Sequence, residues 1–255
     1  MKQLTIIKIG GNVIDDEKAL SKFLSDFSKI KGLKLLVHGG GKLATQLSEK
    51  LGIETKMIEG RRITDAETLK TVTMVYAGWI NKNITAQLNS KKVNAIGLCG
   101  ADLFLIPSYK RKNSEINYGF VGDVLCNEIN IKYLEMFLDQ NIVPVIAPIT
   151  SDKSGQLLNT NADTVASSLA IALSGSYKTR LVYCFEKEGV LNGEKVIPFI
   201  NTKIFKHLKE KQIILNGMIP KLDNALNASE KGVDKVVIGS STQLNKLNAG
   251  TRITY

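Results

Sequence analysis

Two glycine-rich segments follow short apolar runs near the start of the sequence. Gly10 and Gly11 come directly after the run at residues 4–9, and Gly39–Gly41 come shortly after the run at residues 33–37. Glycine lets backbone N–H groups approach an anion closely, and a following helix N-terminus adds positive polarity. Tight turns alone would explain one such pair. A second loop with three glycines favours anion binding, although neither loop has the P-loop or dinucleotide-binding spacing.

Two lysines stand where an anion would be needed to balance them. Lys8 lies between Ile7 and Ile9, and a lysine is costly to bury in a strand covered on both faces. An exposed edge strand would be the alternative explanation. Lys221 follows Pro220, a residue typical of the first helical turn, where the helix dipole disfavours a cation. Both positions indicate binding of a phosphate group.

A polar cluster at residues 159–163 offers further candidates. Asn161 is a predicted helix N-cap and Asp163 lies in the first turn, so capping explains these two residues. Capping does not explain Asn159, which directly precedes them. We therefore count Asn159 and Asp163 among the candidate site residues.

The elements that must position these residues alternate along the chain. Strand-like runs lie at residues 4–9, 33–37, 93–98, 142–147, 180–185 and 235–238. Amphipathic helical patterns lie at residues 19–30, 43–51, 66–88, 131–140, 162–173 and 222–231. This alternation predicts an α/β fold with an open, mainly parallel sheet. In such sheets ligands bind at the carboxyl ends of the strands, so both glycine loops are expected at one crevice.

Composition excludes several other classes of protein. The 255 residues carry 34 Lys plus Arg against 24 Asp plus Glu, a net charge of +10, with 44% hydrophobic residues. These values exclude a disordered or low-complexity chain. The basic surplus fits a nucleic acid, an anionic membrane surface or small anionic substrates. A nucleic-acid partner is disfavoured because no known reading motif is present.

The sequence also indicates a compartment. It has no apolar signal-peptide core and no apolar stretch long enough to span a membrane. Three cysteines far apart and only two histidines argue against a disulfide framework and a zinc site. We expect a cytoplasmic protein with no membrane partner and no resident metal.

Six segments together resemble the N-acetylglutamate kinases, a family within the amino-acid kinase superfamily. They are Ile-Ile-Lys-Ile-Gly-Gly at 6–11, His-Gly-Gly-Gly at 38–41, Gly-Arg-Arg-Ile-Thr at 60–64, Asn-Thr-Asn-Ala-Asp at 159–163, Gly-Met-Ile-Pro-Lys at 217–221 and Gly-Thr-Arg-Ile at 250–253. The resemblance implies a three-layer αβα sandwich with two lobes. The loop-rich segment 148–160 is the nearest to a boundary, so residues 1–160 would bind the acyl amino acid and dimerise, and residues 161–255 would bind the nucleotide.

The resemblance also implies a reaction, the phosphorylation of the γ-carboxylate of N-acetyl-L-glutamate by ATP with Mg²⁺ in arginine biosynthesis. Lys8 and Lys221 would neutralise the transferred phosphoryl group, and Asp163 would orient both lysines. The expected acceptor contacts are Gly40, Gly41, Arg62 and Asn159, with Arg62 on the α-carboxylate. The expected phosphate and ATP contacts are Gly10, Gly11, Glu186, Gly189 and Gly217. No general base is needed, since a carboxylate is already ionised at neutral pH.

The sequence departs from the family pattern in two places. Glu186 stands where many members have an aspartate, which concerns the adenine and ribose contacts. Lys110, Arg111 and Lys112 match no family pattern; they form either a solvated basic loop or a pocket for a larger or acidic acyl group such as succinyl. An N-succinylglutamate or aminoadipate-derivative kinase is thus an alternative.

A non-catalytic amino-acid or nucleotide-binding regulator on the same fold is a second alternative. It is disfavoured because both Lys8 and Lys221 are present. The sequence begins almost directly on its first predicted strand, whereas hexameric, arginine-inhibited members carry an additional N-terminal helix. The resemblance therefore implies a homodimer that is insensitive to arginine.

Overall fold

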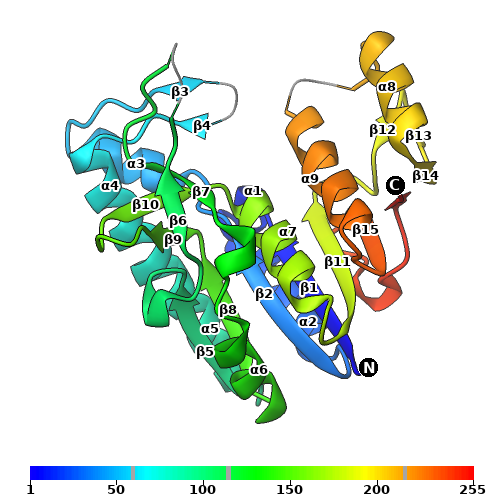
Figure 1. Ribbon diagram of the computed structural model, residues 1–255, viewed down its shortest axis with the longest axis horizontal. Helices are drawn as coiled ribbons and strands as arrows, with labels where there is room; N and C mark the ends of the chain where they lie inside the picture. The colour runs from blue at the N-terminus through cyan, green and yellow to red at the C-terminus, as the bar shows by residue number, and fades with distance from the viewer. Residues whose placement is uncertain (59–60, 113–115, 215–216) are drawn as a thin grey trace.

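An eight-stranded sheet runs through the molecule (Figure 1). The computed structural model describes residues 1–58, 61–112, 116–214 and 217–255. The strand order is β14 (Phe199–Ile200), β16 (Thr251–Ile253), β15 (Lys235–Ser240), β11 (Lys178–Phe185), β1 (Gln3–Ile9), β2 (Leu33–His38), β8 (Val143–Ala147) and β5 (Ala95–Cys99). Every neighbouring pair is parallel except β15 and β16. All six predicted strand runs belong to this sheet, and the predicted α/β fold class is confirmed.

Helices cover both faces of the sheet and give three layers. The helical segments are α1 (Gly11–Ile14), α2 (Glu17–Ser28), α3 (Leu43–Lys50), α4 (Ala66–Thr73), the π-helix η1 (Met74–Ile80), α5 (Asn81–Ser90), α6 (Ile131–Asp139), α7 (Ala162–Leu173), α8 (Thr202–Glu210) and α9 (Ile219–Glu230), with short 3₁₀ turns η2 (Asp102–Phe104), η3 (Cys126–Glu128) and η4 (Leu244–Lys246). Helices α6, α7 and α9 share one core with the sheet, and α2 and α5 share the other. The helix predicted over residues 66–88 is thus three consecutive helical segments.

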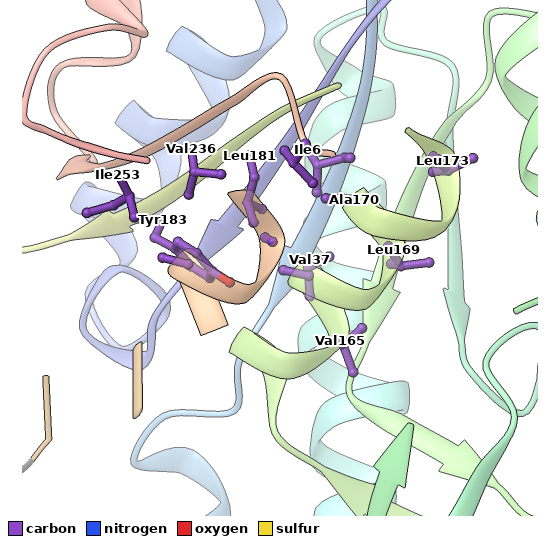
Figure 2. Close-up of a cluster of buried hydrophobic side chains, with 14 of the residues drawn as sticks. Ile6, Val37, Val165, Leu169, Ala170, Leu173, Leu181, Tyr183, Val236 and Ile253 are labelled. Carbon is purple, nitrogen blue, oxygen red and sulfur yellow. The ribbon is translucent and has the colours of Figure 1, made fainter. Parts of the chain in front are cut away.

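The first core lies under α7. Its side chains Val165, Leu169 and Leu173 recur at helical spacing and are fully buried. Figure 2 shows them in one buried cluster with Val37 of β2 and Leu181 of β11. Because β1, β2 and β11 are covered on both faces, their sequences read as near-continuous apolar runs.

Lys34 is a buried cation in β2 with a structural role. Its Nζ donates to the carbonyl oxygens of Phe27 at 2.9 Å, Ser28 at 3.0 Å and Ile30 at 2.8 Å. These carbonyls belong to the carboxyl end of α2 and the residues that follow, where backbone acceptors lack helical partners. Burial lowers the pKa of Lys34. Lys34 therefore ties α2 to the sheet.

A second, four-stranded sheet has the order β6 (Ser108–Lys110), β7 (Val121–Val124), β10 (Leu157–Thr160) and β9 (Ile149–Ser151). The segment 148–160 was expected to be loop-rich, and that expectation is wrong because β9 and β10 pair within it as antiparallel strands. Two hairpins, β3 (Met57–Ile58) with β4 (Arg61–Arg62) and β12 (Leu191–Asn192) with β13 (Lys195–Val196), complete the strands described. The main sheet takes four strands from each side of residue 160, and the division into lobes at 160/161 stays a prediction.

None of the helices within the described residues combines the length and the apolar character that a membrane span requires.

Candidate functional site

Two cavities open near the carboxyl ends of β1, β2 and β11. The first, which we call the Arg62 cavity, has a volume of about 250 Å³ and is lined by Gly39, Gly40, Gly41, Met57, Arg62, Tyr76, Val121, Pro148, Asn159, Thr160, Asn161 and Ala162. The second, the lysine cavity, has a volume of about 410 Å³ and is lined by Lys8, Gly10, Gly11, Asn12, Val13, Cys184, Phe185, Glu186, Lys187, Gly189, Met218 and Lys221. The structure thus divides most of the predicted site residues between two neighbouring spaces.

The two glycine loops meet where the cavities adjoin. A Cβ atom on Gly11 would lie 2.5 Å from the Cα of Gly41, so the two backbones touch. Gly41 has a φ of +56°, a conformation that favours glycine. The carboxylate of Asp15 accepts the N–H of Lys42 at 3.0 and 3.1 Å and so fixes the second loop. The two loops were predicted to face one crevice; they are in contact at the same end of the sheet, but each lines a different cavity.

Lys8 is held by a buried carboxylate. Its Nζ lies 2.7 Å from Oδ1 of Asp163, and the two side chains are only 8% and 9% exposed. Strand β1 lies between β11 and β2 in the middle of the sheet, which excludes the edge-strand explanation for Lys8. Asp163 reaches this position because the side chain of Asn161 caps α7, accepting the N–H groups of Asp163 at 2.8 Å and Thr164 at 3.1 Å.

Lys221 approaches the same place from the other side of the lysine cavity. Its Nζ lies 4.1 Å from the centre of the Phe185 ring, and the Nζ of Lys8 lies 5.7 Å from the same centre. Burial lowers the pKa of Lys221, the carboxylates of Asp163 and Glu186 raise it, and the charge of Lys8 lowers it. Pro220 lies in the first turn of α9, as predicted, and places Lys221 at that helix N-terminus. Two ammonium groups therefore converge on one ring.

Arg62 and Asn159 lie together in the Arg62 cavity. The guanidinium of Arg62 donates to Oγ1 of Thr55 at 3.0 Å and to Oγ1 of Thr45 at 2.9 Å. The Asn159 amide donates to Oγ1 of Thr64 at 3.0 Å, and that hydroxyl donates to the Arg62 carbonyl at 2.9 Å. A planar cation and an amide, both fixed by hydroxyl groups, form a site suited to a carboxylate.

The remaining predicted ATP contacts fall in different places. Glu186 is exposed and Gly189 is buried, and both line the lysine cavity. A Cβ on Gly189 would lie 2.7 Å from Oγ1 of Thr251, so this glycine is required by close packing. Gly217 is exposed and lines neither cavity, although its neighbour Met218 lines the lysine cavity. Gly60, which belongs to the matched segment 60–64, lies outside the described residues.

The basic segment 110–112 is engaged elsewhere. The Nζ of Lys110 lies 4.6 Å from the centre of the Phe120 ring, and Arg111 pairs with the carboxylate of Asp123 through two nitrogens. Lys112 is exposed. None of these three side chains lines the Arg62 cavity as described, so they supply no observed contact for an acidic acyl group.

Sequence reasoning missed two aromatic residues of the site. Tyr76 lines the Arg62 cavity, and the ring of Phe185 faces the ammonium groups of both Lys8 and Lys221. The position of Phe185 at the end of the strand run 180–185 was a usable signal, because strand ends face the crevice. Tyr76 gave no signal, because it reads as an ordinary apolar position in a helical pattern.

Comparison with known protein families shows the family to which this chain belongs, which the geometry of the site alone does not. The model of the amino acid kinase family matches residues 3–240. The chain belongs to the amino acid kinase family. The resemblance that the sequence motifs indicated is therefore confirmed at the level of the family.

Individual relatives share this length and fold. The acetylglutamate kinase of Phocaeicola vulgatus is 53% identical over 99% of this chain and 98% of its own length. The acetylglutamate kinase of Cytophaga hutchinsonii is 54% identical over 97% of this chain and 95% of its own. Among solved structures, the carbamate kinase of Giardia lamblia is 16% identical, covers 98% of each chain and superposes with a TM-score of 0.72, which shows a shared fold.

Proposed function

We propose that this protein is an enzyme that transfers the γ-phosphoryl group of ATP to the γ-carboxylate of N-acetyl-L-glutamate, a step of arginine biosynthesis. The relatives that are about half identical over nearly the whole chain carry the name acetylglutamate kinase. The observation that carries the proposal is the contact between Gly11 and Gly41, because it joins a cavity with two ammonium groups to a cavity with a fixed guanidinium. Donor and acceptor can then meet at one point.

The lysine cavity is the proposed place of ATP. The N–H groups of Gly10 and Gly11 would donate to phosphate oxygens, and the ammonium groups of Lys8 and Lys221 would neutralise the transferred group. Asp163 keeps Lys8 in place, and its charge opposes the lowering of the Lys221 pKa that burial causes. Mg²⁺ would arrive bound to the ATP phosphates, as part of the substrate.

The Arg62 cavity is the proposed place of the acceptor. Arg62 would bind the α-carboxylate and Asn159 the neighbouring amide, which directs the γ-carboxylate towards Gly40 and Gly41. One γ-carboxylate oxygen forms a bond to the γ-phosphorus while the bond from that phosphorus to the β,γ-bridging oxygen breaks. ADP leaves with the electron pair, and the product is an acyl phosphate. The carboxylate is ionised at neutral pH, so no proton has to be removed.

Trapping of the acyl phosphate with hydroxylamine tests this proposal. Wild-type protein is expected to form the hydroxamate only with ATP, Mg²⁺ and N-acetyl-L-glutamate together. Lys221→Met should lower kcat by about 100-fold, since it removes one charge that stabilises the transferred group. Lys231→Met, an exposed lysine at the other end of α9, is the matched control and should stay within about twofold of wild type. A wild-type rate for Lys221→Met, or no hydroxamate from wild type, would contradict the proposal.

A homodimer is part of the same proposal. Met74 and Trp79 of η1 are 55% and 66% exposed, and with Leu43 and Leu47 they border an apolar groove. Such a patch can pair with the same patch of a second copy around a twofold axis. Light scattering should give twice the chain mass of 28.0 kDa, and Trp79→Glu should shift the protein towards the monomer. A wild-type monomer would contradict this assembly.

The cytoplasm is the proposed compartment. ATP is available there, and the thiols of Cys99, Cys126 and Cys184, which are free in the structure, stay reduced.

A further inference from the structure

Tyr76 lies in an unusual helical segment beside the Arg62 cavity. Residues Met74–Ile80 form a π-helix between α4 and α5, a geometry that is rare and frequent at functional sites. Tyr76 is 7% exposed and lines the cavity, whereas Met74 and Trp79 of the same segment face outwards. The π-helix therefore turns one bulky aromatic side chain into the proposed acceptor site.

The ring of Tyr76 packs against the second glycine loop. A Cβ atom on Gly40 would overlap the ring atoms Cε1, Cζ and Cδ1 of Tyr76. The φ angle of Gly40 does not lie in the left-handed region, so its backbone conformation does not require a glycine. The contact with the Tyr76 ring does, because it leaves no room for a side chain. The ring supports the loop whose N–H groups face the reacting carboxylate in the proposed reaction.

The hydroxyl of Tyr76 interacts with the guanidinium that anchors the other end of the acceptor. Burial raises the pKa of Tyr76, while the charge of Arg62 opposes that rise. The phenol thus stays protonated at neutral pH, in the same cavity as the guanidinium. Arg62 donates to the hydroxyl groups of Thr45 and Thr55, and Tyr76 lines the cavity beside it.

Asn81 anchors the helical segment that carries Tyr76. It directly follows the π-helix, and its Nδ2 donates to the carbonyls of Val145 at 2.9 Å and Leu98 at 3.2 Å. The same nitrogen lies 3.1 Å from Nε2 of His38, the residue that precedes the glycine loop. Asn81 therefore ties the carboxyl end of the π-helix to β2, β5 and β8 of the main sheet.

We propose that Tyr76 is a specificity-determining residue that sets the length of the acceptor. One rigid side chain packs against Gly40, near the reacting carboxylate, and lines the cavity that also holds Arg62, at the α-carboxylate, so it limits the space between the two binding points. Under the proposed function a glutamate derivative fits that space, whereas aspartate and 2-aminoadipate derivatives are shorter and longer by one methylene. This inference rests on the proposed function and adds the group that selects among acyl amino acids.

Kinetics with three acceptors test the inference. The hydroxamate assay is run with N-acetyl derivatives of L-aspartate, L-glutamate and L-2-aminoadipate on wild type, Tyr76→Phe and Tyr76→Leu. Tyr76→Phe keeps the ring and loses the hydroxyl, so KM for N-acetyl-L-glutamate should rise about tenfold while kcat and the KM for ATP stay within about twofold. Its preference for the glutamate derivative should persist. Tyr76→Leu should lower that preference by about tenfold or more, because neither anchor is held.

Tyr109→Leu, an exposed tyrosine of β6, is the matched control and should behave as wild type. The inference is overturned when wild type is active and Tyr76→Leu keeps the full preference for the glutamate derivative. It is also overturned when Tyr76→Phe leaves the KM for N-acetyl-L-glutamate unchanged, a readout that needs only the conservative variant to fold. No product from wild type with any of the three acceptors would overturn the proposed function itself, which is a separate outcome.

Discussion

Removing the charge of Asp163 should lower the free energy of unfolding, and the geometry of its ion pair with Lys8 gives the size of the effect. The Lys8 Nζ and Asp163 Oδ1 atoms lie 2.7 Å apart, and both side chains are less than one-tenth exposed. At an effective dielectric constant of about 20, their attraction is about 6 kcal/mol, offset by several kcal/mol of lost hydration for each ion. Asp163→Asn keeps the shape and leaves the Lys8 charge buried without its partner. Breaking such a pair costs about 3–5 kcal/mol, and we expect about 3 because Lys8 borders a cavity.

Urea unfolding followed by circular dichroism measures this loss. Asp234→Asn, an exposed aspartate, is the control and should change the free energy of unfolding by less than about 0.5 kcal/mol. The double variant Lys8→Met with Asp163→Asn should be less destabilised than the sum of its single variants, because it leaves no buried charge. A free energy of unfolding for Asp163→Asn within about 0.5 kcal/mol of wild type would refute this reasoning.

Three further predictions follow from neighbouring features. Gly11→Ala places a Cβ 2.5 Å from the Cα of Gly41 and should lower the free energy of unfolding by about 2 kcal/mol. In Gly10→Ala the new Cβ has its nearest atom 3.9 Å away, so this control should lose less than about 1 kcal/mol. Equal losses for the two variants in urea unfolding would count against the loop contact. Burial lowers the pKa of His38 from 6.5 to about 4, so the unfolded state binds more protons between these values and stability falls as pH drops from 6.5 to 4, by up to about 3 kcal/mol. His38→Gln should flatten that part of the curve of stability against pH, and an unchanged slope would disprove the assignment. Lys34→Met removes three hydrogen bonds to buried or half-buried carbonyls and should cost about 3 kcal/mol in urea unfolding; a loss below about 0.5 would mean that α2 does not depend on this lysine.

The main sheet and the glycine loops could be predicted because their signals are local. Strands β1, β2 and β11 are buried on both faces, so each one reads as a short apolar run. A glycine or a lysine at the end of such a run is placed at the crevice by the direction of the strand alone. The positions of Lys8, Gly11 and Gly41 followed from this rule.

Features made by tertiary contact could not be predicted in the same way. The strands of the second sheet, such as β9 (Ile149–Ser151), have three or four residues, too few for a period of two to appear. The helical pattern over residues 66–88 does not distinguish the π-helix from its α-helical neighbours. Tyr76 therefore looked like a core residue, and its contact with Gly40 and its place beside Arg62 depend on three segments that only the fold brings together.

The central claim is that the two adjoining cavities pass one phosphoryl group from ATP to a carboxylate. Phosphorus NMR of the wild-type protein with ATP, Mg²⁺ and N-acetyl-L-glutamate observes donor and product together. The account predicts that ADP and an acyl-phosphate signal appear in equal amounts at early times, and that neither appears without the acceptor. Loss of ATP with release of inorganic phosphate alone from the start, or unchanged ATP, would contradict it.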